Sequence, residues 1–116
     1  MDVIRTFDLF CGAGGSSLGA QAAGATPLGG VDLWPIATEA FALNLPGTTT
    51  YASDLTALNP AKVAKEVGKI DLLLASPECT NHSIAKGNKP RSEESKQLGY
   101  QVIRFAAALK PHWIVS

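Results

Sequence analysis

The chain has 116 residues, of which 46% are hydrophobic and 17% are charged, a composition typical of a globular protein of about one domain. No apolar run approaches the roughly 18 residues that a membrane span requires. The first residues also lack the basic start and apolar core of a signal peptide, so we expect a cytoplasmic protein without a membrane partner.

Two cysteines, Cys11 and Cys79, are present. They are too few for a disulfide framework and lack the paired spacing of a zinc site, so we expect reduced thiols and no metal. The net charge of zero hides an asymmetry, because residues 1–79 hold 4 Lys or Arg against 8 Asp or Glu, whereas residues 80–116 hold 6 against 2. The basic part could face nucleic-acid phosphates or be an ordinary solvated surface.

Strand and helix patterns alternate along the first half of the chain. A buried strand is predicted over 4–10, followed by a glycine-rich turn and a helix that Ser16 or Ser17 caps and Gly24 ends. A short strand follows over 28–31. Pro35 fits the first position of a second helix, in which Ile36, Ala37, Ala40, Phe41 and Asn44 recur at helical spacing.

The alternation continues through the second half. We expect a strand over 48–52, a helix from the cap Asn59 to the terminator Gly68, and a strand over 70–75. A polar loop over 76–92 exceeds the usual length of such a connection. A final helix follows, with a strand from His112, and its apolar face comprises Leu98, Val102, Phe105 and Leu109. The repeat predicts an α/β fold with a parallel sheet, right-handed crossovers and helices on both faces.

Several polar and glycine residues follow the predicted strands, where ligands of such sheets collect. The glycines of the turn at 12–15 let a ligand approach the backbone, and the helix start offers N–H donors. Asp32 lies 20 residues after Gly12 and could accept both hydroxyls of a ribose, or simply cap the helix at Pro35. Asp54 could accept from the exocyclic amine of a purine or be a turn residue. Phe10 could cover an adenine or belong to the core.

Two segments together resemble one family. Residues 8–15 (DLFCGAGG) resemble the S-adenosylmethionine motif of the DNA (cytosine-5) methyltransferases, and residues 76–83 (SPECTNHS) resemble their nucleophile loop. The resemblance implies a Rossmann-like, three-layer α/β/α methyltransferase fold, present here as about five strand and helix units. It also implies S-adenosyl-L-methionine as cofactor and Cys79 as nucleophile. The residues expected to line the cofactor are Phe10, Gly12, Gly14, Asp32, Leu33, Asp54 and Leu98.

The resemblance also implies a reaction on double-stranded DNA. A thiolate that adds to C6 of a flipped cytosine makes C5 nucleophilic, and its elimination after methyl transfer restores the ring. The residues expected near DNA are Ser83, Lys86, Lys89 and Arg91. The three basic ones could contact phosphates, lower the pKa of the thiol or be solvated loop charges.

The chain departs from the family pattern around its nucleophile. Glu78 stands where the family usually has proline, and a neighbouring carboxylate disfavours a thiolate. Asp32 is shorter than the commoner glutamate, and Leu33 lacks an aromatic face. His82 replaces a phenylalanine. These differences predict a divergent branch that keeps the same reaction.

The family's Glu-Asn-Val motif is expected just beyond Ser116, so residues 1–116 are predicted to form part of a catalytic domain, without the target-recognition region. We expect weak cofactor binding and little turnover from this chain alone. One alternative is a non-catalytic or split subunit that a second polypeptide completes. Another is an NAD-dependent oxidoreductase, which Ser17 disfavours because a third glycine belongs there.

Overall fold

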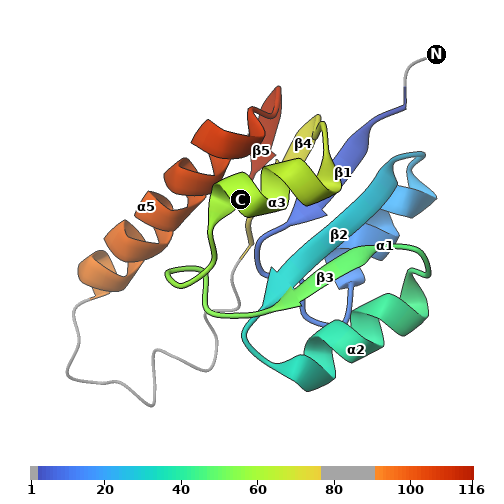
Figure 1. Ribbon diagram of the computed structural model, residues 1–116, viewed down its shortest axis with the longest axis horizontal. Helices are drawn as coiled ribbons and strands as arrows, with labels where there is room; N and C mark the ends of the chain where they lie inside the picture. Colours follow the sequence, from blue (N-terminus) through green and yellow to red (C-terminus); the bar gives the residue numbers. More distant parts are fainter. Residues whose placement is uncertain (1–2, 77–90) are drawn as a thin grey trace.

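The computed structural model describes the backbone of residues 3–76 and 91–116 and the side chains of 3–76 and 96–116. Its centre is a five-stranded sheet of parallel strands in the order β3-β2-β1-β4-β5 (Figure 1). This confirms the predicted α/β class and parallel sheet. The strands are β1 (Arg5–Asp8), β2 (Thr26–Asp32), β3 (Thr49–Ala52), β4 (Leu72–Leu74) and β5 (Trp113–Val115). The helices are α1 (Gly15–Ala22), α2 (Pro35–Asn44), α3 (Pro60–Val67) and α5 (Arg91–Leu109).

The order of the strands creates a reversal in the middle of the sheet. The chain moves outward from β1 through β2 to β3, and then returns to place β4 on the other side of β1. Right-handed crossovers therefore put α1 and α2 on one face and α3 and α5 on the other. Figure 1 shows α3 beside α5, in agreement with their direct packing. The predicted three layers are present, and the reversal lies between β1 and β4.

The larger hydrophobic core lies under α3 and α5. Phe105 and Leu109 of α5 are buried there, and Val102 packs against the same core, which confirms most of the predicted apolar face. A smaller cluster of Cys11, Phe41 and Leu45 lies at α2. Ile36 was expected on the core side of α2, but it is 79% exposed. Ile36 lies in the first turn of α2, whereas the buried residues of this helix, Thr38 and Phe41, lie further along.

The helix ends follow the sequence in part. Pro35 and Pro60 begin their helices, and the side chain of Asn59 accepts a hydrogen bond from the N–H of Ala61 at 3.0 Å, as predicted. The predicted serine cap of α1 is wrong. Gly14 precedes the helix with a left-handed φ of 105°, no side chain caps that end, and Ser17 is buried inside the helix. The left-handed conformation of Gly14 starts the helix here, and no side-chain oxygen accepts from the first N–H groups of the helix.

An irregular register joins β1 to β2. Thr6 pairs with Pro27 and Phe7 pairs with Gly29, so Leu28 is an extra residue in β2. Pro27 is tolerated because the pairing of β2 with β3 begins only at Gly29. At that residue the two backbones are so close that an added Cβ would lie 1.9 Å from the carbonyl oxygen of Thr49. The start of β3 can therefore pair with β2 only because residue 29 is a glycine.

The last strand forms one edge of the sheet among the residues described. β5 pairs with β4, and about half of the surface of each of its three side chains is exposed. Within residues 3–76 and 91–116, no helix combines the length and apolar character needed to cross a membrane.

Candidate functional site

The candidate site lies along the carboxyl ends of the first three strands. The glycine loop follows β1, Asp32 is the last residue of β2, and Asp54 follows β3. Because the strands are parallel, all three positions share one edge of the sheet, beside the reversal between β1 and β4. The N–H of Ser53 donates to the carbonyl of Asp32 at 2.9 Å, which joins the ends of β2 and β3. The structure thus brings these sequence-predicted residues to one place.

The glycine loop has a fixed shape. Gly14 has a φ of 105°, a backbone angle that strongly favours glycine, and an added Cβ would also crowd the ring of Phe41 at 3.2 Å. The side-chain amide of Asn44 donates to the carbonyl of Ala13 at 2.8 Å, and this anchors the loop to the end of α2. The sequence pattern indicates that Asn44 lies on the same helix face as Phe41, but it does not predict this contact. The only sequence signal for this contact is that Asn44 is a polar residue at the end of an otherwise apolar helix face.

Asp32 joins the glycine loop to the start of α2. One carboxylate oxygen accepts from the N–H of Gly12 at 2.9 Å, and the other accepts from the N–H of Trp34 at 3.1 Å. The expected capping role is wrong, because Trp34 is the N-cap of α2 and no side chain caps this helix. Asp32 instead holds the backbone just before the helix and makes a contact to the loop that the sequence did not predict. Each carboxylate oxygen can accept more than one hydrogen bond, so the two contacts leave acceptor capacity for a ligand.

Asp54 shapes the turn after β3. One of its oxygens accepts from both the N–H and the hydroxyl of Thr56, each at 2.9 Å. These hydrogen bonds, the backbone one first, hold the pKa of the Asp54 carboxyl below its ordinary value. The turn role considered from the sequence is thus confirmed, and the exposed carboxylate is ionised at neutral pH.

The remaining predicted residues differ in position. Phe10 is half-buried and packs against the larger core. A core position was the predicted alternative to an adenine contact for this residue. Leu33 is 60% exposed just after β2, and Leu98 is half-buried on α5. β4 ends at the same edge, but Cys79, which follows it in the sequence, lies outside the described residues. So do Ser83, Lys86 and Lys89, and the side chain of Arg91, which begins α5.

Asp8 is a buried acid without a predicted role, although a charged residue at the end of a buried strand is a signal visible in the sequence. Its side chain is at the loop, where one oxygen accepts from the N–H of Phe10 at 3.0 Å. Burial, opposed by that hydrogen bond and reinforced by the charge of Asp32, raises the pKa of Asp8 from 3.8 to about 6. The folded protein therefore binds this proton more tightly than the unfolded chain does.

Asp8→Asn should stabilise the protein at neutral pH but not in acid. A raised carboxyl pKa means that stability is lost as pH rises from 3.8 to about 6. The neutral amide keeps the acceptor for Phe10 and removes this penalty, so we expect a gain of about 1 to 3 kcal/mol at pH 8. Urea unfolding at pH 4 and pH 8 measures it. Equal effects at both pH values would show that the charge of Asp8 is not the cause.

Cys11 is the free thiol among the described residues, and it is shielded. It is 4% exposed, and its Cβ lies beside Gly30. A Cβ added to Gly30 would lie only 2.5 Å from the Cβ of Cys11. Burial, together with the charges of Asp8 and Asp32, raises the pKa of Cys11 from 9.0 to about 12. A thiol in this setting is a packing residue and a poor nucleophile.

Cys11 should therefore resist alkylation in the folded protein. The pKa difference alone lowers its thiolate fraction at pH 8 by about a thousandfold, and burial excludes the reagent as well. Peptide mass spectrometry after a short iodoacetamide treatment should find Cys11 unmodified in buffer and modified in guanidinium chloride. Rapid labelling in buffer would mean that the loop opens readily.

Comparisons with known proteins assign the chain to a family. The family model for C-5 cytosine-specific DNA methylases matches residues 4–116. The type II methyltransferase M.DdeI of Desulfomicrobium norvegicum is 29% identical over 97% of this chain, which covers 27% of that protein. M.XorII of Xanthomonas oryzae is 33% identical over 93% of the chain and 26% of its own length.

A solved structure shares the fold. The crystal structure of a DNA modification methyltransferase encoded within a prophage of E. coli has a TM-score of 0.71 and 29% identity, covering 93% of this chain and 30% of that one. The chain thus spans about a quarter to a third of these relatives. Because the family model covers nearly all of the sequence, the chain belongs to the C-5 cytosine-specific DNA methylase family.

Proposed function

We propose that this chain binds S-adenosylmethionine across the carboxyl ends of β1, β2 and β3 and contributes Cys79 as the nucleophile of DNA cytosine-5 methylation. The observation that carries the proposal is the contact between the N–H of Gly12 and the carboxylate of Asp32 at 2.9 Å. It joins a glycine loop to an acidic strand end within a segment that matches the family. That pairing is what a nucleoside cofactor requires.

The residues of the loop fit such a ligand. The place of a Cβ on Gly12 has no neighbouring atom within 4 Å, so a ligand can approach the backbone there. The first turn of α1 has no side-chain cap, and its N–H groups can face an anionic group. Asp32 would hold a ribose and Asp54 a purine amine, with Phe10, Gly14, Leu33 and Leu98 lining the rest.

The chemistry divides between the cofactor and the chain. The cofactor would supply the methyl group from its sulfonium and leave as the neutral thioether S-adenosylhomocysteine. The sulfur of Cys79 forms a bond to C6 of cytosine, and the electrons of the C5–C6 double bond make C5 nucleophilic. After methylation, the C5 proton leaves to a base, the electrons re-form the double bond, and the bond from sulfur to C6 breaks. A thiolate is suited to both steps because it attacks and leaves readily.

We propose that DNA methylation requires protein segments beyond the 116 residues of this chain. The first relatives are three to four times as long as the part that matches, and double-stranded DNA has to be bound and its cytosine flipped. We therefore propose that the 116-residue chain alone binds the cofactor weakly and turns over little. Further residues or a second polypeptide would supply the missing functions.

Calorimetric titration of the chain with S-adenosylmethionine and with NAD tests the proposal. We expect binding of S-adenosylmethionine and a loss of about tenfold or more in Asp32→Asn, because a carboxylate is a stronger acceptor for ribose hydroxyls than an amide. Asp71→Asn is the matched control, since Asp71 bonds to Arg5 at the opposite end of the strands. Tighter binding of NAD would replace the proposal with the oxidoreductase alternative.

A further inference from the structure

Arg104 links α5 to the turn after β3. Its guanidinium donates to the carbonyl oxygens of Leu55 at 3.0 Å and of Leu58 at 3.1 Å. A third contact, at 2.6 Å, joins it to the side-chain oxygen of Gln101 on the same helix. Nothing in the proposed chemistry uses this arginine. Two of these hydrogen bonds cross from α5 to the turn, and the third, to Gln101, holds the guanidinium in place on its own helix.

The turn that Arg104 holds is the one that fixes Asp54. Residues 54–58 close on themselves, with the N–H of Ala57 donating to the carbonyl of Asp54 at 3.0 Å and Thr56 donating to its carboxylate. The side chains of Leu55 and Leu58 are buried in the larger core. Their carbonyls accept from Arg104, and Asp54 lies on the exposed part of the same turn.

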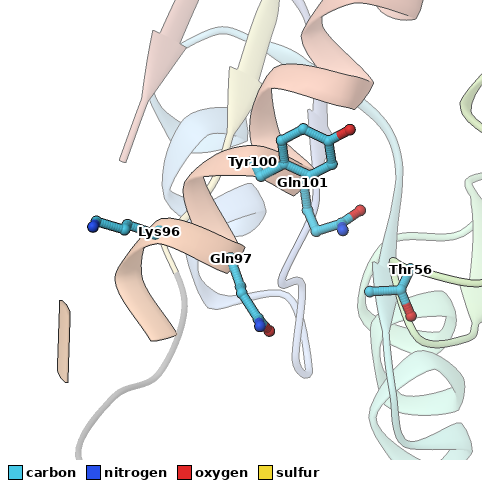
Figure 2. A pocket seen from close by; sticks show the side chains of 5 residues that line it. All are labelled: Thr56, Lys96, Gln97, Tyr100 and Gln101. Carbon is cyan, nitrogen blue, oxygen red and sulfur yellow. The ribbon is translucent and has the colours of Figure 1, made fainter. Parts of the chain in front are cut away.

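A groove separates this turn from α5. Its volume is about 420 Å³, and it is lined by Thr56, Lys96, Gln97, Tyr100 and Gln101. Figure 2 shows the side chain of Gln101 extending from α5 toward Thr56. Gln101 lies one turn after Leu98, and Arg104 lies one turn after Gln101. The position of Arg104 therefore fixes the distance between the Asp54 turn and the part of α5 that carries Leu98.

We propose that Arg104 is a positioning residue that sets the preference of this site for a purine with a 6-amino group. The inference rests on the proposed cofactor site, in which the Asp54 carboxylate accepts from that amine. A 6-oxo purine offers a carbonyl in its place, which a carboxylate repels. Arg104 acts through the carbonyls of Leu55 and Leu58 and does not touch the ligand. Its loss frees the turn, and the discrimination that depends on a fixed carboxylate declines.

The ratio of two affinities tests this role. Calorimetry with S-adenosylhomocysteine and its 6-oxo analogue S-inosylhomocysteine should give the wild-type chain a preference of about tenfold or more for the amine. In Arg104→Met the ratio should approach one, and Arg104→Lys, which keeps a donor, should be intermediate. Arg5→Gln is the control, because Arg5 also bridges two elements, at the other end of the sheet. Equal weakening of both ligands in Arg104→Met, with an unchanged ratio, would overturn the proposal.

Hydrogen exchange provides a second measurement that needs no ligand. The amides of Thr56, Ala57 and Leu58 should lose protection by about tenfold or more in Arg104→Met, lose less in Arg104→Lys, and keep it in Arg5→Gln. Retained protection in both Arg104 variants would overturn the inference. Absence of binding by the wild-type chain would instead count against the cofactor site, and the exchange result would still decide whether Arg104 positions the turn.

Discussion

Cys79→Ala should abolish cytosine methylation by an enzyme that contains this chain. The alanine has no sulfur to add to C6, so C5 stays too weakly nucleophilic to accept a methyl group. Loss of a nucleophile can cost on the order of a millionfold in turnover, which places the product at background. The assay uses a chimera in which residues 4–116 replace the matching part of M.XorII, and it measures transfer of labelled methyl groups to duplex DNA.

Cys11→Ala is the control in the same chimera. Cys11 is buried and its raised pKa keeps it protonated, so its replacement should leave most of the activity. Methylation that survives Cys79→Ala would remove Cys79 from the reaction. Methylation that is lost in Cys11→Ala, with the fold intact, would mean that the wrong thiol has been assigned.

Gly29→Ala should unfold the protein or come close to it. The new Cβ would meet the carbonyl oxygen of Thr49 at 1.9 Å, and both atoms belong to backbone that the pairing of β2 with β3 holds in place. The strands must separate to make room, which removes the hydrogen bonds at the start of β3. We expect a loss of at least about 3 kcal/mol in the free energy of unfolding, measured by urea denaturation.

Gly19→Ala is the matched control for this substitution. Gly19 lies inside α1, where an added Cβ meets no atom within 4 Å. Alanine favours a helix interior, so this variant should be equal to the wild type or more stable by up to about 1 kcal/mol. A similar loss of stability in both variants would show that the close approach of β2 and β3 is not the cause.

The order of strands and helices could be predicted because local signals agreed with one another. Pro35, Asn59 and Gly68 mark helix ends by their own backbone and capping preferences, and the structure confirms all three. The start of α1 could not be predicted in the same way. Ser16 and Ser17 have the right side chains for a cap, but the left-handed Gly14 occupies the cap position two residues before Ser16.

The candidate site was predictable as a set of positions and less so as a set of contacts. Strand ends placed the glycine loop, Asp32 and Asp54 at one edge, because parallel strands end together. The bond from Asp32 to Gly12 joins residues 20 apart, and that from Arg104 to Leu55 joins residues 49 apart. Such contacts depend on how helices settle on the sheet, which periodicity does not specify. The buried charge of Asp8 was a sequence signal that had no assigned role.

The most direct test of the central claim is the site of covalent attachment to DNA. The chimera is incubated with S-adenosylmethionine and a duplex that contains 5-fluorocytosine, whose fluorine blocks release of the enzyme. Peptide mass spectrometry of the trapped complex then locates the bond. We predict a nucleotide adduct on Cys79. An adduct on another residue, or no adduct from a chimera that methylates ordinary DNA, would contradict the account.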